Sequence, residues 1–470
     1  MSEAQALLTA LRQVADATVA AAIERHVEEA PDRDLSRINV VDFAARHGLE
    51  EERTVSAFLH GARLGLFEMS WNVLCPGCGG VLDSNATLKS VRRDEYACAL
   101  CAAGYEATLD EMVEVAFTVT PRVRRIAAHD PDALPFPEYM RQIFWSSGID
   151  LPGDEAYELL LEKIVLDTVE LPGGEKTVRS LQLPEQFCIV FDPVTHSAQF
   201  LDVQGDATRE TQNLTVVFNK LSTPTGKLTV RPGPLRLVLD NRTDLRVLPA
   251  VWIAGAEMHD LLGSRKPFLT AKRLLTNQTF RDIYRTDTLD VDQRLKITSL
   301  TFLFTDLKGS TDLYERVGDL VAYDMVRAHF RVLHEIVAAQ SGAVVKTIGD
   351  AVMATFATPD RAVAAALAMR DAMRALNAEG KQEDLTLKIG MHEGPCLAVM
   401  LNDRLDYFGQ TVNIAARVQG LAVSRSIFAT RAVVGNSEAA ERIGEAGLTP
   451  VPHQALLRGI ADQHTVYEIP

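Results

Sequence analysis

The stretch from Thr301 to Ser310 constrains this chain more than any other. Its apolar first half, 301–305, predicts a strand that stops at Asp306, and a glycine-containing turn follows, with Ser310 or Thr311 as the expected N-cap of a helix. A carboxylate at such a strand end suits a magnesium ion and a phosphate together, because it is a hard oxygen ligand and the free N–H groups of the turn and helix start point at the anion. An ordinary strand–turn–helix with an N-terminal acid also fits.

Length and composition indicate a soluble protein of several domains. The 470 residues are enough for roughly three domains, and 47% hydrophobic with 24% charged residues is typical of globular proteins. We find no signal-peptide pattern near the start and no apolar run of about 18 residues. These absences predict a cytoplasmic location and no membrane partner. The net charge of −15 argues against broad binding to nucleic-acid phosphates.

Residues 1–70 are predicted to form a helical, winged-helix-like segment. Residues 1–30 have a helical apolar face, and residues 38–68 indicate helix, turn, helix and short strand. Winged helices often bind DNA through a basic recognition helix. Here three glutamates, 50–52, open the second helix, and the segment holds 7 Arg or Lys against 12 Asp or Glu, a net charge of −5. This charge argues against DNA and favours a protein-contact or packing role.

Residues 71–107 contain two Cys-x-x-Cys pairs, Cys75/Cys78 and Cys98/Cys101, with 19 residues between them. This spacing predicts a four-thiolate zinc site of the zinc-ribbon type. Four cysteines close a tetrahedral site and leave no open position for catalysis, so the expected zinc ion is structural. A redox dithiol pair and unmetallated cysteines are the alternatives. Two further cysteines, Cys188 and Cys396, lie in apolar strand-like contexts and are expected to pack in the core.

The central part, 108–255, is predicted to be helical first and β-rich afterwards. Residues 110–165 are expected to be largely helical. Short apolar runs separated by turn residues then predict a β-sandwich or barrel that acts as a regulatory or scaffolding module. The predicted strands are 187–191, 198–203, 214–219, 227–230, 235–240 and 246–253. Residues 256–294 are expected to form a helical linker.

From residue 295 onward, predicted strands and helices alternate in a pattern that suits a ferredoxin-like α/β sandwich. After the first strand we expect a helix, a hairpin, a helix, two strands, a helix and a strand. Their ranges are 312–340, 343–356, 361–376, 385–391, 396–401, 409–421 and 426–430. The whole chain is therefore predicted to be a multidomain α+β protein.

Two further motifs add chemistry to this C-terminal part. The predicted hairpin carries Lys346 and a second carboxylate at a glycine turn, Asp350, which together with Asp306 could hold two magnesium ions on a triphosphate. Further on, Asn413 and Arg417 are four residues apart on a predicted helix and so share one face. An amide and a guanidinium on one face can orient a ribose and stabilise phosphate charge.

These motifs, in this order, resemble the class III nucleotidyl cyclases over roughly 295–470. The resemblance implies that Asp306, Asp350 and the backbone carbonyl of Leu307 bind two Mg²⁺ or Mn²⁺ ions. It implies that Lys346 and Asp406 read adenine, because guanylyl cyclases generally have Glu and Cys there. The expected substrate is therefore ATP, and the expected product is cyclic AMP.

The resemblance also implies roles for four other side chains. Asn413 would orient the ribose and Arg417 would stabilise the transition state. Lys388 stands where the family usually has a phosphate-contacting Arg, and Arg458 where it often has a phosphate-contacting Lys. Both departures keep the charge but alter the geometry. In this family the site lies between two cyclase domains, so one domain per chain implies a homodimer.

Two classes of function remain open at this point. The first is a cytosolic adenylate cyclase in signal transduction, regulated through its N-terminal half by an unknown ligand or protein. The second is a catalytically degenerate cyclase fold that serves as a dimer platform for a DNA- or protein-binding regulator. The complete set of motif residues favours the first, and the acidic charge of residues 1–70 disfavours the DNA form of the second.

Overall fold

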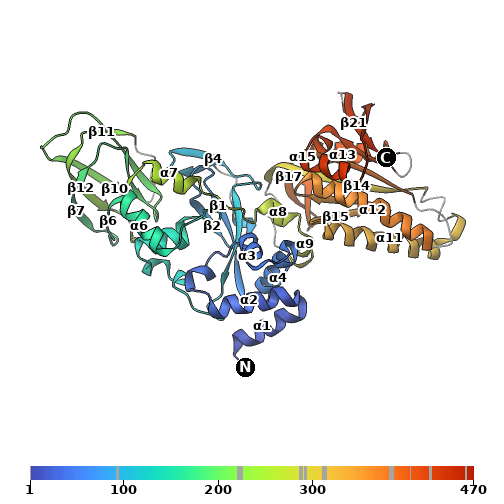
Figure 1. Ribbon diagram of the computed structural model, residues 1–470, viewed down its shortest axis with the longest axis horizontal. Helices are drawn as coiled ribbons and strands as arrows, with labels where there is room; N and C mark the ends of the chain where they lie inside the picture. The colour runs from blue at the N-terminus through green and yellow to red at the C-terminus, as the bar shows by residue number, and fades with distance from the viewer. Residues whose placement is uncertain are drawn as a thin grey trace. The chain divides into compact units, whose positions relative to one another are not determined.

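The structure, a computed structural model, describes residues 2–91, 95–219, 226–284, 289, 294–309, 315–379, 386–402, 404–422, 426–460 and 463–470. The chain divides into two compact units. The N-terminal unit comprises residues 1–107 and 111–269, and the C-terminal unit comprises residues 108–110 and 270–470. Each unit is described by itself (Figure 1).

The N-terminal unit begins with four helices, α1 (Glu3–Val14), α2 (Ala17–Glu29), α3 (Val40–His47) and α4 (Glu51–Leu64). Asp16 ends the first apolar run and caps α2 by accepting hydrogen bonds from the backbone N–H groups of Thr18 and Val19. Gly48, with φ of +63°, ends α3 in a left-handed conformation that glycine adopts easily. After α4 the chain enters β1 (Phe67–Leu74), so helix, turn, helix and strand follow one another as the sequence predicted.

The prediction that residues 110–165 are largely helical is wrong at its start. Residues Val113–Val119 form β5, which pairs with β1 in a sheet of order β2-β1-β5, where β2 is Val81–Asn85. Large apolar residues occupy every second position of this strand, with Glu114, Ala116 and Thr118 between them, and this period of two indicates a strand although both faces are largely buried. Only α5 (Phe136–Tyr139), a π-helical turn (Met140–Phe144) and α6 (Asp154–Ile164) are longer helical elements in this interval.

Two sheets follow and share one apolar core. One has the order β10-β12-β7 and the other the order β11-β9-β8-β13-β6. Buried residues of both sheets, such as Val190, Leu201 and Leu237, belong to the same cluster. The strands are β6 (Val165–Thr168), β7 (Lys176–Leu183), β8 (Cys188–Asp192), β9 (Ser197–Val203), β10 (Gln212–Phe218), β11 (Leu228–Val230), β12 (Gly233–Asn241) and β13 (Ala250–Ile253). The sequence prediction did not include β6 and β7.

The expected helix over residues 256–290 is interrupted. It consists of α7 (Ala256–Gly263), α8 (Ala271–Leu275) and α9 (Gln278–Ile283), and the chain between α7 and α8 contains Pro267, which cannot donate a helical hydrogen bond. The interruption coincides with the division of the chain, because α7 belongs to the N-terminal unit and the other two helices to the C-terminal unit. A single linking helix is therefore a wrong prediction.

The C-terminal unit contains a mixed sheet of order β15-β16-β14-β17-β19-β21-β20, and β18 pairs with β17. The sequence predicted two strands, 385–391 and 396–401; their described residues, 386–391 and 396–401, belong to one long strand, and residue 385 lies outside the described residues. The strands are β14 (Leu295–Lys308), β15 (Gly342–Ile348), β16 (Ala351–Phe356), β17 (Thr386–Leu401), β18 (Arg404–Phe408), β19 (Ile427–Thr430), β20 (Val451–Leu456) and β21 (Gln463–Ile469).

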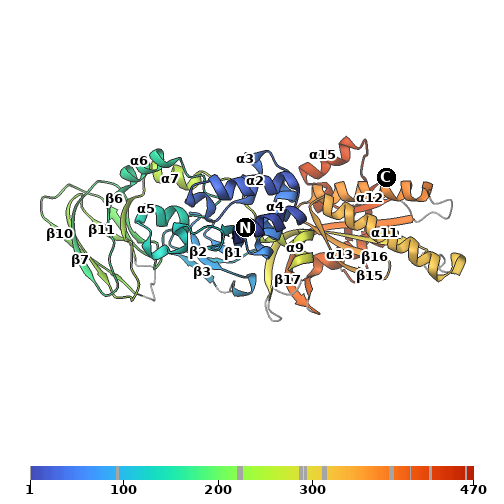
Figure 2. The ribbon, with the colours of Figure 1, turned by 90° about the horizontal axis from the view of Figure 1, so that it is seen from below.

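Helices cover both faces of this sheet. The helices α11 (Asp319–Ala339) and α12 (Pro359–Glu379) lie side by side in Figure 2, and they share an apolar cluster with α14 (Arg431–Val434), α15 (Ser437–Glu445) and the facing strand residues. The helix α13 (Gln410–Gln419) packs through Ile414 and Val418 against Phe428 and Val466 in a separate cluster. The alternation of strands and helices expected of an α/β domain is thus present.

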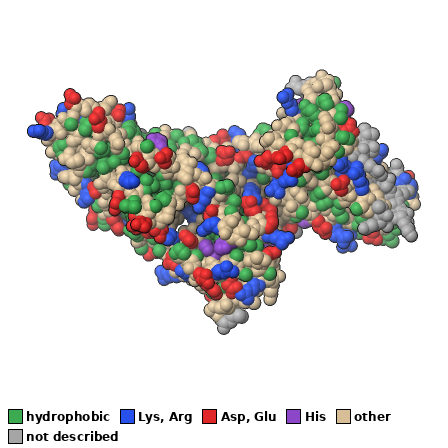
Figure 3. All heavy atoms as spheres, in the orientation of Figure 1, with side chains coloured by type: hydrophobic (Ala, Val, Ile, Leu, Met, Phe, Trp, Pro, Cys, Tyr) green, Lys and Arg blue, Asp and Glu red, His purple; other side chains and the backbone are tan. Residues whose placement is uncertain are grey.

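Two surface features accompany this fold. Acidic and basic side chains are interspersed over the face drawn in Figure 3. Among the residues that the structure describes, no helix has both the length and the apolar character needed to cross a bilayer.

Candidate active site and cysteine cluster

The two carboxylates predicted to bind metal lie at the same end of the C-terminal sheet. Asp306 is near the end of β14, and Asp350 follows Gly349 in the turn between β15 and β16. Gly349 has φ of +62°, which suits glycine at this tight turn. Because Thr305 pairs with Val352, the strand ladder brings the turn beside Asp306. Leu307, whose carbonyl was a further expected ligand, follows in the same strand.

The atom Oδ2 of Asp350 is buried and has no hydrogen-bond partner among the described residues. A buried carboxylate oxygen without a donor is costly unless a cation or water satisfies it. Hard oxygen donors of this kind fit Mg²⁺ or Mn²⁺. The residues present therefore fit the divalent ions that the sequence motifs imply. The neighbouring His329 of α11 is fully buried; burial lowers its pKa to about 4, and the charge of Asp350 opposes this shift.

Lys388 lies directly opposite Asp306 in the ladder between β14 and β17. Its Nζ is 3.6 Å from Asp306 Oδ2. This ammonium therefore lies beside a carboxylate predicted to bind metal, where it can also reach a phosphate.

Lys346 and Asp406, the pair expected to read a base, are in contact. Lys346 Nζ is 2.5 Å from Asp406 Oδ2, although the two residues come from β15 and β18. Asp406 is largely buried and its Oδ1 also accepts a hydrogen bond from the backbone N–H of Tyr407, 2.8 Å away. The pair presents an ammonium donor and a carboxylate acceptor next to each other.

Two glycines of β17 allow α13 to approach the sheet closely. A Cβ on Gly390 would lie 2.1 Å from the backbone nitrogen of Gln419, and a Cβ on Gly394 would lie 2.8 Å from Thr411 Oγ1. The Thr411 hydroxyl donates a 2.5 Å hydrogen bond to the carbonyl of Pro395. These contacts fix the helix that carries Asn413 and Arg417, and they leave the Asn413 side chain exposed.

Arg417 contacts the loop that carries Arg458. Its Nη1 donates a hydrogen bond to the carbonyl oxygen of Arg458. This contact uses the backbone of Arg458 and not its guanidinium. The Arg458 side chain is exposed, so its guanidinium can still contact an anion.

The predicted site residues thus form three contacting groups within one chain: Asp306 with Lys388, Lys346 with Asp406, and Arg417 with Arg458. Among the described residues, no hydrogen bond or ion pair joins one group to another. Asp350 belongs with the first group through the strand ladder.

Sequence reasoning missed two residues of α9 that hold the strands of the base-reading pair. Gln278 Oε1 accepts a 2.8 Å hydrogen bond from the backbone N–H of Val344 in β15, and Arg281 Nη2 donates a 2.6 Å hydrogen bond to the carbonyl of Leu405 in β18. Their spacing of three residues on a short helix was the only signal, and it did not distinguish them from a solvated face.

The four cysteines of the N-terminal unit come together as predicted. Their sulfur atoms all lie within 4.8 Å of one another, and the Sγ atoms of Cys75 and Cys101, and of Cys78 and Cys98, are 3.6 Å apart. A tetrahedral ion with metal–sulfur bonds of about 2.3 Å requires sulfur separations of about 3.8 Å. The cluster can therefore hold one metal ion.

The local backbone supports this geometry. The second pair spans the hairpin of β3 (Glu95–Cys98) and β4 (Ala103–Glu106), and Gly79 N–H donates a 2.8 Å hydrogen bond to the Cys75 carbonyl at the first pair. Hydrogen bonds within the cluster, chiefly those with Cys101, lower the pKa of the Cys75 thiol and raise the pKa of the Cys78 and Cys98 thiols. A thiolate is the form that binds metal.

Comparisons with known proteins divide the chain in a similar way. Residues 1–282 match a family of unknown function (DUF5939), and residues 293–445 match the adenylate and guanylate cyclase catalytic domain. "Adenylate cyclase 2" of Rhizobium meliloti is 35% identical over 132 residues, which cover 26% of this chain and 36% of that protein. An adenylate cyclase of Anabaena cylindrica is 26% identical over 185 residues, covering 36% of each. The chain thus spans about a third of the length of these relatives.

Solved cyclase structures resemble the same part of the chain. The adenylyl cyclase CyaB from P. aeruginosa has 22% sequence identity and a TM-score of 0.33, covering 38% of this chain and 96% of that one. The guanylate cyclase domain of RhGC from Catenaria anguillulae, in complex with GTP, has 21% identity and a TM-score of 0.33, covering 37% and 97%. Because the first family match spans more than half of the chain, this protein belongs to the family of unknown function DUF5939, and it carries a class III adenylate and guanylate cyclase catalytic domain at residues 293–445.

Proposed function

We propose that this protein is an adenylate cyclase that converts ATP to 3′,5′-cyclic AMP and pyrophosphate. The observation that carries the choice of base is the contact between Lys346 and Asp406. An ammonium can donate to adenine N1 and a carboxylate can accept from the 6-amino group, whereas guanine presents the opposite pattern at these two positions. The relatives named adenylate cyclase support the same choice.

The residues of the chain divide the work as follows. Asp306 and Asp350, with the carbonyl of Leu307, would hold two divalent ions, which when bound lower the pKa of the ribose 3′-hydroxyl and neutralise the triphosphate. Asn413 orients the ribose. The 3′-hydroxyl gives up its proton to water, its oxygen attacks the α-phosphorus, the bond from that phosphorus to the bridging oxygen breaks, and pyrophosphate leaves. Arg417 stabilises the charge that develops in the transition state, and Lys388 and Arg458 hold the phosphates.

We further propose that a complete site needs two copies of the chain. The carboxylate group and the Lys346–Asp406 group contact their own neighbours within one chain but not each other among the described residues. A homodimer would place the carboxylates of one protomer against the base-reading pair and Arg417 of its partner. Two equivalent sites would result.

The N-terminal unit is proposed to regulate this activity and to hold a structural zinc ion in its cysteine cluster. The five-part division of the chain and a cytoplasmic location remain predictions. The alternative function is a catalytically degenerate dimer platform for a DNA- or protein-binding regulator. It predicts that the purified chain turns over neither ATP nor GTP.

The test measures cyclic AMP and cyclic GMP formed by the purified chain with Mg²⁺ or Mn²⁺. We expect a clear preference for ATP, because the wrong base leaves buried polar groups unpaired at roughly 1–3 kcal/mol per group. The double variant Lys346→Glu with Asp406→Cys should reduce or reverse that preference. Equal turnover of both nucleotides by the natural chain would show that this pair does not read the base. Turnover of neither would favour the alternative.

A further inference from the structure

The N-terminal unit contains a polar pocket of about 320 Å³ that has no part in the proposed reaction. This volume lies at the lower end of the range for small-molecule sites. The pocket is formed by the chain around the start of α3, by residues 141–154 and by Lys266. Its charged lining consists of the cations Arg33, Arg37, Arg46, Arg141 and Lys266 and the carboxylates Asp34, Asp42 and Asp154.

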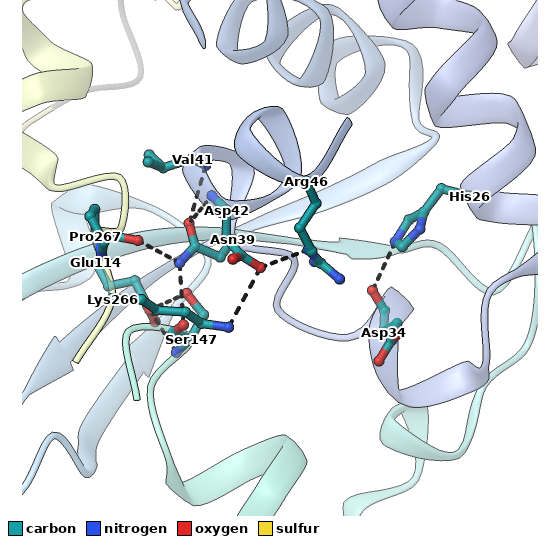
Figure 4. A network of polar contacts seen from close by, with 10 residues as sticks. All are labelled: His26, Asp34, Asn39, Val41, Asp42, Arg46, Glu114, Ser147, Lys266 and Pro267. Atoms are coloured by element: carbon teal, nitrogen blue, oxygen red, sulfur yellow. Dashed lines mark hydrogen bonds and ion pairs between the residues drawn. The ribbon is translucent and has the colours of Figure 1, made fainter. Parts of the chain in front are cut away.

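Two of the three carboxylates are each shared by two cations. Asp42 Oδ2 lies 2.9 Å from Arg46 Nε and 3.5 Å from Lys266 Nζ, so that it lies between the two cations in Figure 4. Asp154 is 2.8 Å from Arg141 Nη1 and 2.5 Å from Arg33 Nη2. Five cations against three carboxylates leave a formal surplus of two positive charges in the lining. This surplus contrasts with the net charge of −15 of the chain.

Arg37 accounts for much of this surplus. Its guanidinium donates a hydrogen bond to the carbonyl of Ile143 but forms no ion pair with any described residue. Its backbone has φ of +47°, an uncommon value for a non-glycine residue, and its N–H is held 3.0 Å from Thr118 Oγ1. Burial lowers the pKa of Arg37, an effect that the charge of Glu114 opposes.

Glu114 does not neutralise Arg37 by direct contact, because other donors occupy its oxygens. Oε1 accepts hydrogen bonds from the backbone N–H and the hydroxyl of Ser147, at 2.9 and 2.6 Å, and Oε2 accepts one from Asn72 Nδ2 at 2.9 Å. Arg37 is half-buried, and a partly desolvated cation without a paired carboxylate is costly unless an anion reaches it.

Two more features of the lining point to a polar ligand. Gln142 is 7% exposed, and its Oε1 is buried without a hydrogen-bond partner among the described residues. Gly153, at the N-terminus of the 11-residue helix α6, gives that helix no side-chain cap. Free N–H groups at a helix start favour an anion, and an unpaired amide oxygen can accept from a ligand hydroxyl.

We propose that this pocket binds a small phosphomonoester that also carries a hydroxyl group. A phosphomonoester has a charge of about −1.5 to −2 at pH 7, which matches the surplus of the lining. The Arg37 guanidinium has N–H donors beyond the one that bonds to Ile143, and these suit contacts with phosphate oxygens. Gln142 accepts from the hydroxyl. The pocket would thereby give the N-terminal unit a ligand of its own.

The first test uses isothermal titration calorimetry of the full chain with adenosine 5′-monophosphate, inorganic phosphate and adenosine as probes. We expect the monophosphate to bind most tightly, phosphate more weakly and adenosine least. Arg37→Gln should weaken monophosphate binding at least tenfold, because hydrogen bonds between charged groups are strong. Arg236→Gln removes one positive charge from an exposed residue of β12 that does not line the pocket, and it should leave the affinity unchanged.

The second test removes a competing negative charge. Asp34 is partly exposed and reaches Arg33 only at 3.8 Å, while its backbone carbonyl, which an Asn retains, accepts from His26 as drawn in Figure 4. Asp34→Asn should therefore keep the fold and tighten monophosphate binding about threefold. Urea unfolding of each variant separates lost binding from lost folding.

Opposite effects of the two variants support the proposal, since a purely structural role for these ion pairs would not tighten binding on loss of Asp34. The proposal is overturned if the natural chain binds neither phosphate-bearing probe at millimolar concentration. It is also overturned if folded Arg37→Gln binds the monophosphate as the natural chain does, which would place that binding at the cyclase residues.

Discussion

The cysteine cluster and the cyclase motif residues differ in how much of a site one chain assembles. The four cysteine sulfurs lie within 4.8 Å of one another and can close a metal site alone. The cyclase residues instead form separate contacting groups, such as Lys346 with Asp406 and Arg417 with Arg458. The difference teaches that a short, local spacing can bring a whole site together, whereas the long-range motifs bring together separate groups, which we propose that a second copy completes.

The largest expected effect is a loss of stability when the four-cysteine cluster is disrupted. Cys78→Ser should lower the zinc content of the purified protein and destabilise the N-terminal unit, because metal binding at such sites contributes on the order of 10 kcal/mol to folding. Metal analysis and thermal unfolding measure the two effects. Residues Asp306 and Asp350 should remain competent, since they belong to the other compact unit.

The matched control is Cys188→Ser, which changes a buried cysteine of β8 outside the cluster. It should cost some stability through the buried hydroxyl but leave the zinc content unchanged. Natural protein that holds no zinc when purified without chelator would remove the structural-zinc proposal.

The next effect tests the site that two chains are proposed to share. Asp306→Ala should abolish activity through loss of a metal carboxylate, and Arg417→Ala should lower kcat by 10²–10³-fold, or about 3–4 kcal/mol. Mixing the two variants should restore activity to about a quarter of the natural level, because about half of randomly paired dimers are mixed and each has one intact site. Cyclic AMP formation before and after mixing provides the measurement.

The same experiment on the cysteine cluster should give the opposite result. Mixed Cys78→Ser and Cys98→Ser chains should not regain zinc, because every chain keeps its own lesion. If mixing the two cyclase variants restores nothing while heterodimers are shown to form, the shared-site mechanism is wrong.

The cysteine cluster and the cyclase residues were predictable from the sequence for different reasons. Cys75, Cys78, Cys98 and Cys101 were predictable because two short knuckles fix each pair locally. Asp306 and Asp350 were predictable from strand–turn motifs, and the strand ladder brings them to one sheet end. Their proposed metal-binding roles came from the order of several motifs, and these two residues lie within residues 293–445, which match the cyclase catalytic domain.

Other features were missed for different reasons. The strand Val113–Val119 alternates apolar residues with Glu114, Ala116 and Thr118, a period of two that indicates a strand and that the helical prediction overlooked. The polar pocket draws Arg37, Asp154 and Lys266 from distant parts of the chain, and only tertiary packing brings them together. Arg281 was read as part of a linker because its partner, the carbonyl of Leu405, is a backbone atom.

A third prediction compares the acid response of the two units. Burial lowers the pKa of His196 in the N-terminal unit and of His392 in the C-terminal unit to about 4. An unfolded histidine titrates near 6.5, so the unfolded chain binds more protons below that pH and stability falls as pH drops from about 6.5 towards 4. Each histidine should cost up to about 2 kcal/mol at pH 5 relative to pH 7.5.

Urea unfolding at the two pH values measures this loss. His392→Gln should remove its share of the pH dependence, while the neighbouring Thr430, whose Oγ1 is 2.7 Å from His392 Nδ1, stays in place. An unchanged pH dependence in the variant would mean that His392 is protonated in the folded protein at pH 5.

The smallest expected effect concerns how one chain orients its part of the shared site. Arg281 holds the carbonyl of Leu405, next to Asp406, and its guanidinium carbon lies 5.9 Å from the ring centre of Tyr407. Arg281→Ala should let β18 move and loosen the Lys346–Asp406 contact. A hydrogen bond between a charged donor and a neutral acceptor contributes about 1.5–3 kcal/mol. Since only part of this free energy affects binding of the base, we expect KM for ATP to rise about three- to tenfold.

A positioning role predicts that this rise falls on ATP and that Arg281→Lys recovers part of it, because a lysine ammonium can still donate to the Leu405 carbonyl. The control Arg374→Ala removes an exposed arginine of α12, which pairs only with Asp371 among the described residues, and should change neither KM nor kcat. A drop in kcat with KM unchanged would contradict the positioning role, because it would connect Arg281 to the transition state.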